Sequence, residues 1–99
     1  MILDNNKKIA NYIVIPNDIK EELFSRLLDA KIDCTILNSS GMFLKAGQTT
    51  CLSVTNESQV DTINSILHKI EKEFLNKNDN EIKQHIIYFT VPVIDFKVF

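Results

Sequence analysis

The stretch that decides the fold runs from Ile32 to Asn56 and reads IDCTILNSSGMFLKAGQTTCLSVTN. Its two ends are rich in Ile, Val, Leu and Thr, a composition typical of β-strands. Between these ends lie Gly41 and Gly47, the two glycines of the chain. Two strand-like runs joined by about ten residues that include both glycines predict a β-hairpin with an enlarged loop. We expect its strands at residues 32–39 and 49–56.

The segment before this hairpin has the spacing of an amphipathic helix. Asn17 or Asp18 can cap it, and Glu21 and Glu22 give its first turn the charge that the helix dipole favours. Apolar side chains recur along one face of the helix. They are Ile19, Leu23, Phe24, Leu27, Leu28 and Ala30. The pattern predicts a helix over residues 18–30.

The segment after the hairpin gives the clearest helical period in the sequence. Ser58 is the expected N-cap, and Asp61 three residues on forms a variant of the capping box. The apolar positions are spaced three or four residues apart. They are Val60, Ile63, Leu67, Ile70 and Phe74. Charged residues at 69 and 71–73 lie on the other face, which indicates a solvated surface.

Strand-like segments lie outside both helices. Residues 8–16, KIANYIVIP, are apolar nearly throughout and predict a central strand. Residues 84–96, QHIIYFTVPVIDF, predict a last strand with Pro92 at its end or at a sheet edge. A polar connector is expected at 76–83 and a loose tail at 1–8. The order βαββαβ predicts an α+β, ferredoxin-like fold: a four-stranded antiparallel sheet with two helices on one face, in a single domain over residues 1–99.

Composition limits the classes of function. The 99 residues carry a formal net charge of −2, so the chain lacks the basic surface that nucleic-acid binding needs. No apolar run approaches the ~20 residues of a membrane span, and the N-terminus lacks the apolar core of a signal peptide. We expect a cytoplasmic protein with neither nucleic-acid nor membrane partners. Cys34 and Cys51 match no zinc or redox motif and are expected as free thiols, although neighbouring strands would allow a bridge.

The first and last strands are apolar on both faces. Ile13 and Ile15 alternate with Tyr12 and Val14 in the first strand, and the last strand has the same property. Two helices cover only one face of such a sheet, so the other face would expose apolar side chains. Exposed apolar faces favour association, and we therefore expect a homo-oligomer.

The glycine stretch admits several functions. A Walker phosphate loop is excluded, because Gly41 and Gly47 are one residue too far apart and Gln48 follows the second glycine. A catalytic loop lacks a base, since His68 and His85 are the two histidines and both are expected at the surface. Ligand recognition through free backbone amides and nearby hydroxyls is one remaining interpretation. A plain hairpin tip is the other, and the residues alone leave both open.

The same stretch carries a resemblance. TILNSSGMFLKAGQTTCLSV, residues 35–54, is similar to the T-x-L-x-[ST]-[ST]-G-G-F-L-[RK]-A-G-N-T-T segment of the PII-like cyclic-di-AMP receptor proteins. FTVPVIDFKVF, residues 89–99, resembles the F-V-L-P-V-D-x-F ending of that family. The resemblance implies a trimer of βαββαβ subunits that binds the dinucleotide in clefts between neighbours. It also implies a signalling protein rather than an enzyme, with no cofactor, no catalytic residue and no metal.

The resemblance also assigns roles to individual residues. Thr35 would make a polar contact to the nucleotide, Gln48 would stand where the family has a base-reading asparagine, and Phe89 would supply an aromatic surface. The loop that closes over base and phosphate would contain Gly41, Phe43, Leu44 and Lys45.

The sequence departs from the family pattern at several places. Met42 replaces a glycine, Asp33 stands where an arginine is common, and Val98 stands where the family has a glutamine. The connector at 76–83 is much shorter than the family loop. The chain therefore has two candidate functions: a nucleotide-binding trimer with an unidentified downstream protein, or a ligand-free interaction module that uses the apolar tip from Met42 to Leu44. A metal-tolerance-like protein or an isomerase of this fold is disfavoured by the lack of a His, Cys and Asp cluster.

Overall fold

The computed structural model describes residues 7–37, 47–75 and 85–94. The regular elements in chain order are β1 (Lys8–Pro16), a 3₁₀ turn (Asn17–Ile19), α1 (Lys20–Asp29), β2 (Thr35–Leu37), β3 (Gln48–Asn56), α2 (Glu57–Ile70), a π-helical turn (Glu71–Leu75) and β4 (Ile87–Val93). The strand predicted over residues 8–16 is confirmed at both ends. Lys8 therefore belongs to this strand and not to the predicted loose tail, of which residues 1–6 lie outside the described residues.

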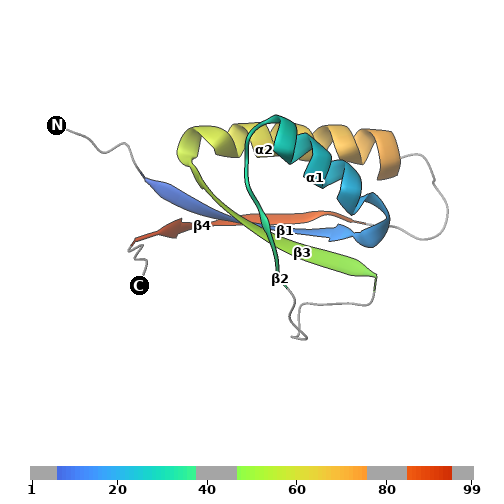
Figure 1. The fold of residues 1–99 in the computed structure, drawn as a ribbon, viewed down its shortest axis with the longest axis horizontal. Coiled ribbons are helices and arrows are strands. Elements are labelled where there is room, and N and C mark those ends of the chain that lie inside the picture. The colour runs from blue at the N-terminus through green and yellow to red at the C-terminus, as the bar shows by residue number, and fades with distance from the viewer. Residues whose placement is uncertain (1–6, 38–46, 76–84, 95–99) are drawn as a thin grey trace.

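The four strands form one antiparallel sheet in the order β2-β3-β1-β4. Both helices lie on the same side of this sheet, and no helix of the described chain covers its other side (Figure 1). This arrangement confirms the predicted ferredoxin-like fold. Pro92 is accommodated because β4 is an edge strand, where a missing backbone N–H is tolerated.

The hydrophobic core lies between the helices and the sheet. Alternate residues of β1 and β3 meet the apolar stripes of α1 and α2 there. The buried members are Ile13, Ile15, Ile19, Leu23, Leu27, Ile32, Cys51, Ile63, Leu67 and Ile70. The periodic positions of both predicted helices account for most of this set, as expected for helices that are stabilised mainly by packing.

Helix α1 begins and ends differently from the prediction. Neither Asn17 nor Asp18 caps it: the Oδ1 atom of Asn17 instead accepts a hydrogen bond from the Thr49 hydroxyl. Leu28, predicted to widen the buried stripe, is 73% exposed. The helix closes in a Schellman motif, in which the backbone N–H groups of Lys31 and Ile32 donate to carbonyls of the last turn. Lys31 occupies the position with positive φ, 62°, that glycine usually fills.

Helix α2 begins two residues earlier than predicted. Asn56 is its N-cap in place of Ser58, and the Oε1 atom of Gln59 accepts from the Asn56 backbone N–H at 3.0 Å. At the other end, Phe74 falls in the π-helical turn and is 41% exposed, so the predicted stripe ends at Ile70.

The hairpin strands also differ in length from the prediction. Strand β2 contains three residues, because 32–34 run beside β3 without regular pairing, and residues 38 and 39 lie outside the described part of the chain. Strand β3 gains Gln48 at its start. Strand β4 begins at Ile87, later than the predicted last strand. Residues 84, 95 and 96 of that predicted strand lie outside the described part of the chain, and so does the predicted connector at 76–83.

Candidate functional site

The uncovered face of the sheet is apolar, and we call it the open face. Register places Ala10, Tyr12, Val14, Leu52, Val54, Ile87, Phe89 and Val91 on this side. Four of them remain well exposed in the isolated chain, at 42% for Val54, 50% for Ile87, 47% for Phe89 and 43% for Val91. The prediction that the sheet face without helices exposes apolar side chains is therefore confirmed.

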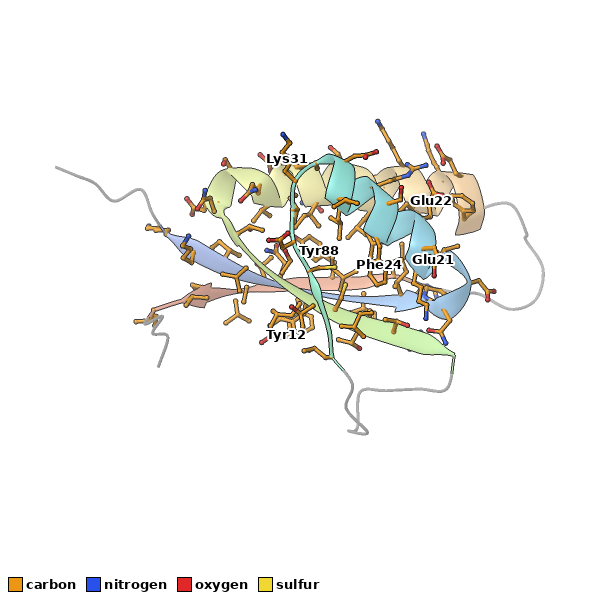
Figure 2. The ribbon with its side chains drawn as sticks, in the orientation of Figure 1. Tyr12, Glu21, Glu22, Phe24, Lys31 and Tyr88 are labelled. Atoms are coloured by element: carbon orange, nitrogen blue, oxygen red, sulfur yellow. The ribbon has the colours of Figure 1, made fainter. Side chains whose placement is uncertain are left out.

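One row of four residues crosses the open face from edge to edge. Thr35 on β2 pairs with Leu52, Leu52 with Tyr12, and Tyr12 with Phe89 on β4. The rings of Tyr12 and Phe89 stack with centroids 4.9 Å apart and planes inclined by 10°. Figure 2 shows Tyr12 on the side of the sheet opposite to Tyr88 and Phe24. One flat aromatic surface therefore lies at the β4 side of the open face.

The sequence-predicted site residues share a face but not a single contact site. Thr35 and Phe89 are three strands apart, which is roughly 14 Å at the usual spacing between strands. Gln48 pairs with Pro16 and lies four residues along β3 from the row, roughly 13 Å away. Thr35 and Phe89 are exposed and Gln48 is half-buried. Within one chain, a small ligand that touches one of these residues cannot touch all three.

The remaining predicted residues cannot be placed. Gly41, Phe43, Leu44 and Lys45 lie outside the described residues, as do the departures Met42 and Val98. Asp33 is described: its side chain is exposed, and its backbone carbonyl accepts a hydrogen bond from the Ser53 hydroxyl. A free carboxylate two residues before Thr35 makes this end of the face less favourable for an anion.

The two threonines at the start of β3 have opposite environments. Thr49 faces the helices, where its hydroxyl donates to Asn17. Thr50 faces the open side between Val14 and Leu37, its partners in the register. Its Oγ1 atom is shielded from solvent and has no hydrogen-bond partner among the described residues. The sequence does not distinguish the two hydroxyls, because only the register assigns them to faces.

A buried polar network lies directly behind the aromatic row. Asn11 is fully buried, and its side-chain amide donates to the Ser53 carbonyl and to the Thr55 hydroxyl, both at 2.9 Å. The Tyr88 hydroxyl donates to Asn11 Oδ1 at 2.6 Å. Burial, and then the nearby Asp61 carboxylate, raise the pKa of Tyr88, so the phenol stays protonated as this donor. The network links β4 to β1. It thereby also holds Phe89, which follows Tyr88 in the sequence, in position.

The two cysteines lie close together beneath β2. Both carry free thiols, with Cys51 buried and Cys34 half-buried. Burial raises the pKa of Cys51 to about 12, and the neighbouring Cys34 adds to the effect. Burial also raises the pKa of Cys34, against a hydrogen bond with Cys51 that lowers it. Neither thiol is activated for nucleophilic or redox chemistry, which needs a thiolate.

The two histidines line one small cavity, of about 200 Å³, between α2 and the start of β4. Both are exposed, as predicted, and His68 Nδ1 lies 3.9 Å from Glu71 Oε1. Among the described residues, no group of three His, Cys, Asp or Glu side chains is arranged to hold a metal ion. A more open groove of about 940 Å³ runs along the start of α2 and is lined mainly by polar side chains, among them Lys7, Asp61 and Thr90. Neither hollow contains a predicted site residue.

Comparison with protein families decides the assignment. The family model described as cyclic-di-AMP receptor matches residues 7–86. The chain belongs to the cyclic-di-AMP receptor family. The resemblance seen in the hairpin is thereby confirmed, and the family is one of receptors. Comparison with curated protein sequences finds no match.

Solved structures share the fold at low sequence identity. A functionally unknown protein from Pediococcus pentosaceus is 23% identical and has a TM-score of 0.66, with 97% of this chain and 100% of that chain covered. A putative PII-like signalling protein from Thermus thermophilus is 15% identical, with a TM-score of 0.58 and coverage of 92% and 90%. CPII from Thiomonas intermedia, bound to ADP, AMP and acetate, is 12% identical, with a TM-score of 0.57 and coverage of 92% of each chain. These likenesses show the PII-like fold. None of the helices in the described parts of the chain is long and apolar enough to span a membrane.

Proposed function

We propose that this protein is a small PII-like signalling protein that binds cyclic di-AMP in clefts between the subunits of a homotrimer and passes the signal to an unidentified downstream protein. The observation that carries the proposal is the match of residues 7–86 to the cyclic-di-AMP receptor family. Binding of ADP and AMP by the Thiomonas protein of the same fold supports a nucleotide as ligand. The cytoplasmic location and the absence of a cofactor stay predictions.

The open face supports self-association. Four of its apolar residues on β3 and β4 are 42–50% exposed in the isolated chain, and burial of such a surface stabilises by about 25 cal/mol per Å². A homo-oligomer buries the face against identical copies of the chain, and such oligomers usually have closed symmetry. The number three rests on the family resemblance.

The spacing across the row supports a ligand site shared by two copies. A base stacked on Phe89 is far beyond the ~3 Å hydrogen-bond reach of Thr35 in the same chain. Thr35 lies on the β2 edge and Phe89 on the β4 edge, so a neighbouring copy can bring the two residues together. In the proposed site, Thr35, Gly41, Phe43, Leu44, Lys45 and Gln48 come from one subunit and Phe89 from the next.

Calorimetric titration with cyclic di-AMP, ATP and cyclic di-GMP, together with light scattering on the same sample, tests the proposal. We expect a trimer that binds cyclic di-AMP at one ligand per subunit. An intact trimer that binds none of the three nucleotides would reject the nucleotide function. A monomer would reject the shared site.

A mixing experiment tests the division of the site. Thr35→Val and Phe89→Ala should each weaken binding when present in all subunits. In co-expressed trimers of the two variants, roughly a quarter of the clefts would combine an unchanged Thr35 with an unchanged Phe89 from a neighbour. These clefts should bind with wild-type affinity. No recovery of wild-type sites would mean that both residues act within one chain.

A second candidate function is a ligand-free interaction module whose apolar tip, Met42 to Leu44, docks on a protein partner. The exposed Asp33 carboxylate near Thr35 favours it, because a negative charge there opposes an anionic ligand. A pull-down with wild type and the double variant Phe43→Ala, Leu44→Ala tests it. Loss of a specific partner from the double variant, in a protein that binds no nucleotide, would establish this function.

A further inference from the structure

The hydroxyl of Thr50 makes no hydrogen bond within residues 7–37, 47–75 and 85–94, the part of the chain that the structure describes. Its Oγ1 atom is nevertheless shielded from water. Its neighbours in the register are the apolar side chains of Val14 and Leu37, which can neither donate nor accept a hydrogen bond. A shielded polar atom without a partner destabilises a protein, and such atoms are rare in folded chains. A valine of the same shape would avoid the cost.

The position of Thr50 points to the missing partner. It lies two residues from Gln48 on the same face of β3, so the two side chains project side by side onto the open face. It also pairs with Leu37, the last described residue before the glycine-containing stretch. A ligand held at this end of the face would therefore meet both the Gln48 amide and the Thr50 hydroxyl.

We propose that Thr50 is a ligand-binding residue, whose hydroxyl beside Gln48 hydrogen-bonds the edge of the nucleotide base. This inference rests on the proposed nucleotide-binding function. A threonine hydroxyl can both donate and accept, so it can pair with an amino group or with a ring nitrogen of adenine. Binding requires the base to displace part of the apolar cover that Val14 and Leu37 provide. The hydrogen bond then forms in a site with little water, where a missing partner costs most.

The adjacent threonine provides a matched control. Thr49 has the same side chain, but its hydroxyl is already bonded to Asn17 on the helix side of the sheet. Thr50→Val should raise the melting temperature of the ligand-free protein and weaken cyclic di-AMP binding by about tenfold. Thr49→Val should lower the melting temperature and leave the affinity unchanged. Thr50→Ser retains the hydroxyl and should keep the affinity within about threefold of wild type.

The experiment is calorimetric titration of wild type and the three variants with cyclic di-AMP and cyclic di-GMP, with melting curves and light scattering of each. A loss of cyclic di-AMP affinity of about tenfold in Thr50→Val, with Thr49→Val unchanged and Thr50→Ser within about threefold of wild type, supports the proposal. Wild-type affinity in Thr50→Val overturns it and leaves the proposed function standing. A ligand-free Thr50→Val that melts lower, or that no longer associates, also overturns it, because the hydroxyl would then serve the fold or the contact between copies. Failure of wild type itself to bind rejects the proposed function, and this inference with it.

Discussion

Removal of the Tyr88 hydroxyl should destabilise the protein through the buried Asn11. In Tyr88→Phe the Oδ1 atom of Asn11 loses its donor, which lies at 2.6 Å, while the residue stays fully buried. The other contacts of the amide, at 2.9 Å to Ser53 and Thr55 and at 3.3 Å to the Ile9 carbonyl, come from its nitrogen and cannot replace that donor. A buried acceptor left unpaired costs about 1–3 kcal/mol. For a chain of this size the melting temperature should fall by roughly 5–15 °C.

The assay is thermal and urea unfolding at two protein concentrations, because association also stabilises the folded state. Tyr12→Phe is the matched control: the Tyr12 hydroxyl makes no hydrogen bond within the described chain, so its loss should change stability by less than about 0.5 kcal/mol. In an Asn11→Leu background the acceptor is gone, and Tyr88→Phe should then cost little more. Equal stability of Tyr88→Phe and Tyr12→Phe would refute the argument that the network anchors β4.

Three further predictions concern stability. Lys31→Gly should stabilise the protein by about 1 kcal/mol, because Lys31 has a φ of 62° at the end of α1; a lower melting temperature would contradict this. Cys51 has its pKa raised from 9.0 to about 12 in the folded state, so the stability it contributes is complete below pH 9 and is lost as the pH rises from 9 to 12. The free energy of unfolding should therefore fall less steeply with pH across that range for Cys51→Val than for wild type. Parallel pH profiles of the two proteins would show that Cys51 is not the group responsible. Leu27→Ala should cost about 2–5 kcal/mol, because the side chain is 1% exposed in the core; a loss below about 1 kcal/mol, measured by urea unfolding, would show that the core relaxes around the gap.

The periodicity of apolar residues in the sequence was sufficient to predict the helical layer and the sheet. The spacing of Ile63, Leu67 and Ile70 matches the buried stripe of α2, and the apolar run of β1 matches the strand at both ends. These features follow from the chain itself, since a helix or strand must bury its apolar side. The family resemblance in the hairpin rested on a local motif in the same way.

Features that depend on a partner distant in the chain could not be predicted. Asn17 was predicted to cap α1, but its side chain accepts a hydrogen bond from Thr49 instead. Lys31 adopts a positive φ at a position where the sequence has no glycine to indicate the turn. The candidate site shows the same limit. The sequence could identify Thr35 and Phe89 as candidate ligand contacts, but only the strand order shows that they lie on opposite edges of the sheet. Only the register separates Thr49, which is bonded to Asn17, from Thr50, which has no partner in the described part of the chain.

The placement of the tyrosines has a practical optical consequence. The chain contains two tyrosines and no tryptophan, so its ultraviolet emission arises from these two phenols. Tyr12 stacks on the open face, while Tyr88 is hydrogen-bonded beneath the helices. A Tyr88→Phe sample would report events on one side of the sheet, and a Tyr12→Phe sample events on the other. Subunit assembly and opening of the helical layer could thus be followed separately, without an attached dye.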